Sequence, residues 1–172
     1  MLRSFVPLII AAAPVMASTP GLSVDNWWEK ITVTMNHDGQ AQACRYETSA
    51  ASADAKDCTV VGASSAAATS AKDQYATITF ERRFSPGGAP PMESAMAAGD
   101  KLLGRQVMAL AIDGAGKVSG CKVIAESGDT GLTYGCDDVA AERFQTGASA
   151  TAADQRQGFM TILVYGHTEH VV

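Results

Sequence analysis

The sequence predicts a fold of mixed strands and helices, built from two repeated units that each run strand, turn, strand, helix, strand. Three features predict it. Apolar residues alternate with polar ones where each unit starts, a turn glycine lies five residues before a cysteine in both, and a second cysteine follows at nearly the same distance. Alternating strands with glycine turns are common by themselves, so the repeat rests on the shared order of these features.

The first unit spans residues 18–83 and the second spans residues 107–172. Each opens with two alternating strands joined by a turn, at Asp38-Gly39 in the first unit and at 113–116 in the second. The alternating positions are Ile31, Val33 and Met35 with Cys44, Tyr46 and Thr48 in the first unit, and Met108, Leu110 and Ile112 with Cys121, Val123 and Ala125 in the second. Side chains two apart share one face of a strand, so each unit is expected to begin with a hairpin.

Helix-compatible stretches follow at 59–74 and 137–146. The second is the better helix. Asp137 and Asp138 suit its N-terminal end, and Cys136, Ala140 and Phe144 fall on one face.

A third strand closes each unit, at 75–81 and at 159–165. Residues 84–106 between the units begin with a run of prolines and glycines, which predicts a linker. Pairing of the two third strands, or of the two first strands, would join both units in one sheet.

The four cysteines are Cys44, Cys58, Cys121 and Cys136. Separations of 14 and 15 residues match neither a CxxC redox motif nor ordinary zinc-ligand pairs, so we expect structural disulfides and no metal. Spacing alone leaves three connectivities open. The repeat selects Cys44–Cys58 and Cys121–Cys136, each tying a second strand to the start of a helix.

Residues 1–17 are expected to be a cleaved signal peptide. Arg3 supplies a positive charge, residues 5–16 are almost wholly apolar, and the small residue Ala17 suits cleavage after it. The apolar run is shorter than the roughly 20 residues of a membrane span and contains Pro7 and Pro14, which disfavours a retained anchor. We therefore expect a periplasmic or secreted protein of 155 residues in an oxidising compartment, without a stable membrane anchor.

Charge and composition exclude some functions. Loss of Arg3 with the signal changes the formal net charge from −5 to −6, whereas nucleic-acid binding needs a basic surface. Aromatic residues make up only 6% of the chain, which predicts a thin core in which cross-links matter more.

No arrangement of residues indicates catalysis, so we expect no enzyme activity and no cofactor. The sequence has no GxSxG, GxxxxGK[ST] or GxGxxG motif. Asp129-Thr130-Gly131 spells the tripeptide of aspartic proteases, but it lies in a predicted loop and has no second copy. His37 lies beside a turn, and His167 and His170 are more typical of a solvated tail than of a metal site.

Two pairs of large side chains lie outside these motifs. Trp27 and Trp28 would point to opposite faces of a strand, and we expect both to be buried, with an exposed tryptophan as the alternative and a candidate interface anchor. Arg82 and Arg83 are expected to end a strand in solvent.

Residues 107–165 carry short motifs in a fixed order. They are a turn ending in Gly116-Lys117-Val118, then Cys121-Lys122-Val123, a Ser127-Gly128 loop, a second cysteine, Glu142-Arg143-Phe144, and a last apolar strand. In this order they resemble the C-terminal domain of TonB, the energy transducer of Gram-negative bacteria. The resemblance covers about 60 residues, and the paired cysteines look like those of a subset of such domains.

The resemblance implies an α+β fold, a small antiparallel sheet with helices packed on it. It also implies capture of a short segment of an outer-membrane receptor, which is added as a strand beside the last strand of the sheet. The residues of that expected peptide-binding edge are Phe159, Met160, Thr161, Ile162, Leu163, Val164 and Tyr165. The alternative is a plain sheet strand that a neighbouring strand satisfies.

The chain departs from the family in what precedes this domain. TonB has a membrane helix and a long proline-rich spacer there, whereas this chain has a signal peptide and a sister unit. Without an anchor it could not transmit force from the inner membrane. We therefore expect a protein- or peptide-binding module of the cell envelope, the alternatives being an accessory or structural envelope protein without strand capture and, less favoured, an envelope hydrolase.

Overall fold

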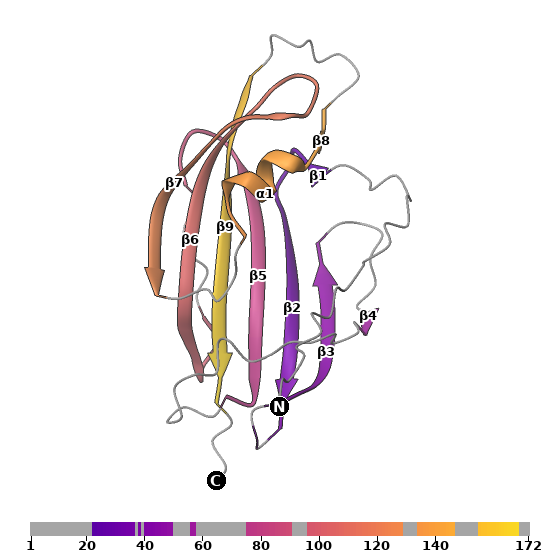
Figure 1. The fold of residues 1–172 in the computed structure, drawn as a ribbon, viewed down its shortest axis with the longest axis vertical. Coiled ribbons are helices and arrows are strands. Elements are labelled where there is room, and N and C mark those ends of the chain that lie inside the picture. The colour runs from indigo at the N-terminus through magenta and orange to yellow at the C-terminus, as the bar shows by residue number, and fades with distance from the viewer. Residues whose placement is uncertain are drawn as a thin grey trace, which may run out of the picture.

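The computed structural model describes residues 22–36, 38, 40–49, 56–57, 75–90, 96–128, 134–146 and 155–168. This part of the chain is mostly β-sheet, with one short helix lying on one face of a large antiparallel sheet (Figure 1). None of its helices is long and apolar enough to cross a membrane. The signal peptide and the helix expected at 59–74 lie outside the described residues.

Seven strands form the large sheet. Their bounds are Trp27–Met35 for β2, Ala41–Thr48 for β3, Lys56–Asp57 for β4, Thr77–Pro86 for β5, Asp100–Ile112 for β6, Val118–Gly128 for β7 and Arg156–His167 for β9. Their order across the sheet is β4-β3-β2-β5-β9-β6-β7, and all neighbours are antiparallel. The short strands β1 (Leu22–Ser23) and β8 (Phe144–Gln145) pair in parallel as a separate two-stranded sheet.

Both expected hairpins are present, β2 with β3 and β6 with β7. Their turns are held in the same way. Asn36 Oδ1 accepts hydrogen bonds from the N–H groups of Asp38 and Gln40, at 3.0 and 2.7 Å. Asp113 Oδ1 accepts them from Ala115 and Lys117, at 3.0 and 2.9 Å. A short acceptor side chain at the start of a turn fixes its backbone, so each turn sets the register of its hairpin.

The two third strands lie side by side in the middle of the sheet (Figure 1). β5 and β9 pair antiparallel from Thr77 opposite His167 to Pro86 opposite Gly158. Beyond them β2 pairs with β5, and β6 pairs with β9. Of the two strand pairings that the sequence leaves open, the structure has the one between the two expected third strands.

The linker expected at 84–106 is longer than the connection that the structure has. β5 continues through Pro86 and β6 begins at Asp100, so both ends of the expected linker belong to strands. Phe84 shows why, because its side chain is buried in the core. Proline and glycine predicted a break there, but burial of this aromatic ring extends the strand.

The helix α1 spans Cys136–Ala141, so it begins one residue before the predicted start at 137 and ends five residues before the predicted end at 146. Its buried side chain is Val139, not Ala140. Glu142 has an extended backbone, and Phe144, the first residue of β8, then pairs with Leu22 of β1. Phe144 is buried against the ring of Phe84 at a centroid distance of 4.9 Å, which it reaches from a strand and not from a helix.

The main core lies between α1 and the sheet. Its buried members are Trp27, Phe84, Met108, Leu110, Ile112, Val118, Val139, Phe144, Met160 and Ile162. Gly158 on β9 makes room for it, because a Cβ there would lie 2.5 Å from the ring of Phe84. The ring of Phe84 therefore packs directly against the backbone of β9 at Gly158.

Candidate functional site

The expected peptide-binding edge, Phe159–Tyr165, is not an edge. It lies in β9, between β5 and β6. Phe159 is opposite Ser85 on one side and Ala109 on the other, and the pairing continues on both sides through Tyr165. The backbone groups of this segment are therefore used within the sheet. The physical reason is that β5 occupies the position beside it.

The outer strands of the sheet are β7 at one end and β3 with the two-residue β4 at the other (Figure 1). β7 pairs with β6 from Gly104 opposite Gly128 to Ile112 opposite Val118, and no described strand pairs with its other side. β3 is partly covered, because Arg45 and Tyr46 pair with β4. Within the described residues, β7 therefore offers the longest open edge.

β7 exposes apolar side chains and is irregular. Val123 and Ile124 are 38% and 44% exposed, so both lie open to solvent at the end of the sheet. The register shifts twice along β7, once between the partners Val107 and Met108 and once near Ile112. Such bulges interrupt a ladder and increase its twist, which limits pairing with another strand to short segments.

The open strand is tied to the helix by a disulfide. Cys121 on β7 and Cys136 at the start of α1 are bonded, with their Cα atoms 5.5 Å apart. This is the pair that the repeat selects. Cys44 is also disulfide-bonded, but its expected partner Cys58 lies outside the described residues. The Cys121–Cys136 bond therefore holds α1 against β7, and the side of β7 that faces away from β6 stays unpaired among the described strands.

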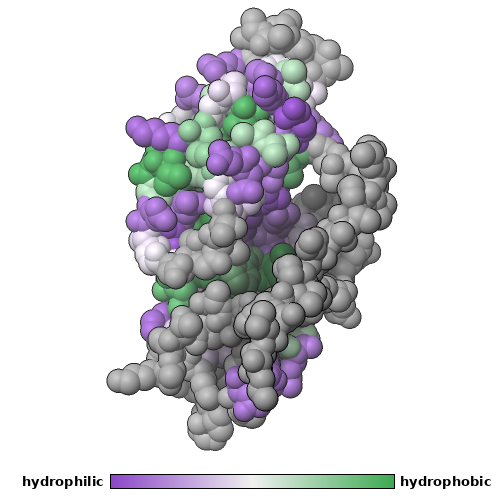
Figure 2. All heavy atoms as spheres, in the orientation of Figure 1, coloured by the Kyte–Doolittle hydropathy of each residue, from purple (hydrophilic) through white to green (hydrophobic). Residues whose placement is uncertain are grey.

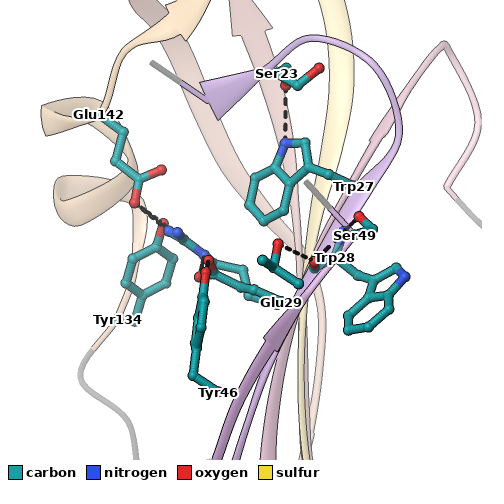
Figure 3. A network of polar contacts seen from close by, with 10 residues as sticks. Ser23, Trp27, Trp28, Glu29, Tyr46, Ser49, Tyr134 and Glu142 are labelled. Carbon is teal, nitrogen blue, oxygen red and sulfur yellow. Dashed lines mark hydrogen bonds and ion pairs between the residues drawn. The ribbon is translucent and has the colours of Figure 1, made fainter. Parts of the chain in front are cut away.

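A polar network joins the end of α1 to the sheet, and Figure 3 shows Glu142 and Tyr134 converging with Glu29 and Tyr46. Arg82 links the two sides through ion pairs with Glu29 and Glu142. Its Nε donates to Glu29 Oε1 at 2.6 Å, and its Nη1 donates to Glu142 and, at 2.8 Å, to the Tyr134 hydroxyl. The guanidinium also lies over the rings of Trp27 and Tyr134, 5.2 and 5.3 Å from their centroids. The expectation that Arg82 ends a strand in solvent is wrong, because β5 continues beyond it.

The network shifts the ionisation of its members. Burial lowers the pKa of Arg82, but its electrostatic interactions with Tyr134, Glu29 and Glu142 outweigh that effect, so the pKa is raised. Burial also raises the pKa of the Tyr134 hydroxyl; Arg82 opposes this rise and Glu142 adds to it. Tyr134 therefore keeps its proton and donates it to Glu142 Oε1 at 2.8 Å. The arrangement is therefore an ion pair that the neighbouring hydroxyl holds in place.

A second charged cluster lies on the opposite face of the sheet. Glu81 is only 3% exposed, and its carboxylate is paired with Arg83 and with Lys30, whose Nζ is 3.5 Å away. The Tyr165 hydroxyl donates to Glu81 Oε2 at 3.3 Å. Alternation could have indicated this cluster, because residues 81 and 83 share one face of β5.

The tryptophans and histidines considered in the sequence do not form one site within the described residues. Trp27 is buried, with its indole N–H donating to the Ser23 carbonyl at 3.0 Å, whereas Trp28 is half-buried, so the two are not both in the core. His167 Nδ1 lies 2.9 Å from Asp100 Oδ1. His37, His170 and the segment 129–131 lie outside the described residues.

No protein-family model, curated protein or solved structure matches the chain. The resemblance to the TonB domain rests on the sequence motifs alone.

Proposed function

We propose that the chain is an exported, non-catalytic module of the cell envelope that binds an extended protein segment by adding it as a strand to the outer edge of β7. The observation that carries this proposal is the one-sided pairing of β7 within the described residues. An unpaired row of backbone N–H and C=O groups is what strand addition needs.

We also propose that the fold consists of two TonB-like units. Read from either outer hairpin towards the centre, the strands run second, first, third: β3-β2-β5 from one end and β7-β6-β9 from the other. The two hairpin turns share their hydrogen bonds as well, since Asn36 and Asp113 each accept from the residues two and four positions later. Each also donates its own N–H to the carbonyl four residues on, at 2.9 Å in both turns. This match supports a duplication.

The duplication explains why the binding edge moves. In the family, the captured segment lies beside the last strand of the sheet. Here β5 lies beside β9 at that position, so each unit supplies the strand that the other would capture. β7 is the next candidate, and the exposed Val123 and Ile124 give a bound segment an apolar surface to contact.

A second candidate function is an accessory envelope protein that captures no strand. The two register shifts of β7 favour it, because bulges are a common protection of sheet edges. The side chain of Lys122 has the same effect, because it would place a charge beside an incoming strand.

A site-specific photo-crosslinker distinguishes the two candidates. We would place it at Ile124, on the open edge, and at Leu102, which is similarly exposed at 40% but lies on the inner strand β6. Strand addition predicts a discrete adduct in intact cells from position 124 and none from 102. Equal labelling from both positions, or no adduct from 124, would contradict strand addition and favour the accessory envelope protein.

Two proline variants then test whether the backbone makes the contact. Along an antiparallel strand, the N–H groups of consecutive residues alternate between its two sides. Of Ala125→Pro and Glu126→Pro, one therefore removes a bond to β6 and the other removes a donor on the open side. The variant that keeps the thermal unfolding midpoint should lose the adduct. An adduct of unchanged yield in that variant would contradict strand addition.

A further inference from the structure

The sheet face that carries α1 has an open hollow beside the Arg82 network. Its volume is about 460 Å³, within the range of roughly 300–1,000 Å³ that is usual for small-molecule sites. Its lining includes Glu29, Ile31, Phe80, Arg82, Tyr134 and Ile162. Figure 2 shows apolar surface next to hydrophilic surface on this side of the molecule.

Residues of three strands line the hollow together with Tyr134, and the register of the strands explains its two chemical parts. Ile31 on β2 lies opposite Phe80 on β5, which gives an apolar row. Two residues along the strands, on the same face of the sheet, Glu29 lies opposite Arg82, and Arg82 lies opposite Ile162 on β9. The hollow therefore has an apolar floor and a charged rim. Ile31 is 41% exposed although it lies in the middle of β2, so this apolar floor is open to solvent.

The rim carries more negative than positive charge. One guanidinium, that of Arg82, serves two carboxylates, those of Glu29 and Glu142. The hydroxyls of Tyr46 and Tyr134 complete their hydrogen bonds without adding charge. Glu142 Oε2 is buried and accepts no hydrogen bond from the described residues. Because Glu29 is still a quarter exposed, its carboxylate can be reached from solvent.

We propose that this hollow binds an organic cation, an ammonium group carried on an apolar aryl or alkyl body. The apolar body lies on Ile31, Phe80 and Ile162. The ammonium group lies at the rim, where it donates to Glu29 and faces the ring of Tyr134. A carboxylate and an aromatic ring both attract an ammonium group, and the surplus negative charge excludes an anion of the same shape. This ligand site is separate from the β7 edge.

Three probes with one apolar body test the proposal on the full, unaltered chain: 4-phenylbutylamine, 4-phenylbutanol and 4-phenylbutyrate. We expect the amine to bind about tenfold more tightly than the alcohol, and the carboxylate to bind most weakly. Amide chemical shifts in an NMR titration should change at residues 29–31, 80–82 and 162. Equal affinities for the three probes, tightest binding of the carboxylate, or shifts confined to other residues would overturn the proposal.

Matched variants separate the charge from the apolar floor. Glu29→Gln should weaken the amine about tenfold and leave the alcohol unchanged, whereas Glu126→Gln, which removes an exposed carboxylate from β7, should change neither. Ile31→Ser should weaken all three probes, and Leu102→Ser, at a similarly exposed position on β6, should weaken none. Loss of alcohol binding in Glu29→Gln, or an amine affinity that Glu29→Gln leaves unaltered, would contradict the role of this carboxylate.

Discussion

Ile31 and Met108 occupy the same position of the predicted repeat, one on β2 and the other on β6, yet their surroundings differ. Met108 is 0% exposed and lies in the core beneath α1. Ile31 is 41% exposed in the apolar floor of the open hollow. Alternation decides which face a side chain is on, but burial depends on what lies across from that face. Within the described residues, only the second half of the sheet has a helix across it.

The halves differ in their polar residues as well. Beneath α1 the packing is apolar, with Val139 and Met160 both 0% exposed. The first half has Glu29 and Arg82 on the same face, held by an ion pair and by the tyrosines around it. An ion pair holds its partners in place but adds little net stability compared with apolar packing. The second half should therefore carry more of the stability of the fold.

The largest effect is expected from truncating the two equivalent side chains. Met108→Ala leaves a cavity in a closed core and should lower the free energy of unfolding by about 2–5 kcal/mol. Ile31→Ala removes a side chain that solvent already reaches and should cost less than about 1 kcal/mol. Urea denaturation of both variants measures the difference. Equal costs would show that the two halves are equally packed.

The disulfide between β7 and α1 should contribute the next largest effect. The double variant Cys121→Ser, Cys136→Ser opens a loop of 15 residues, which corresponds to about 3 kcal/mol in the chain-entropy model. Peptide mapping without reduction should recover the 121–136 link in the unaltered chain. Denaturation at the same midpoint in the double variant would mean that α1 is held by its apolar contacts alone.

The smallest effect concerns the ionisation of Tyr134. Burial raises the pKa of its hydroxyl above the ordinary value of about 10, so the protonated form is favoured in the fold. Its contribution to stability is full below about pH 10 and is lost as the pH rises from there towards the pKa of the folded state. Denaturation between pH 8 and 11 should therefore show a shallower alkaline fall in Tyr134→Phe than in the unaltered chain. Tyr75→Phe, outside the network, serves as the control variant, and an identical fall in Tyr134→Phe would exclude the effect.

Local pattern predicted much of the fold. The alternating residues of both hairpins lie in strands, and the third strands lie where their apolar runs placed them. The lengths of β5 and α1 were predicted wrongly. Phe84 extends β5 into a proline-rich segment, and Phe144 ends the helix early because it packs on Phe84. Both are effects of contacts between residues far apart in the sequence, which a local pattern does not contain.

The site was harder to predict for the same reason. The apolar run indicates that Phe159–Tyr165 is a strand, but it says nothing about which strands lie beside it. The apolar run does carry one signal. A strand that is apolar at successive positions, as from Phe159 to Met160 and from Ile162 to Val164, is typical of a strand buried on both faces. Likewise Arg82 continues the alternation of Ile78 and Phe80, which places it on the face of the core.

The central pairing of β5 with β9 has a consequence for how the chain can fold during synthesis. A chain that emerges from its N-terminus completes β5 at Pro86, whereas β9 begins only at Arg156. Until then one side of β5 is an open edge next to apolar side chains, which is the kind of surface that leads to misassembly. The sheet closes only when β9 has emerged. β9 thus decides whether β5 ends in its own sheet or pairs with a strand of another molecule.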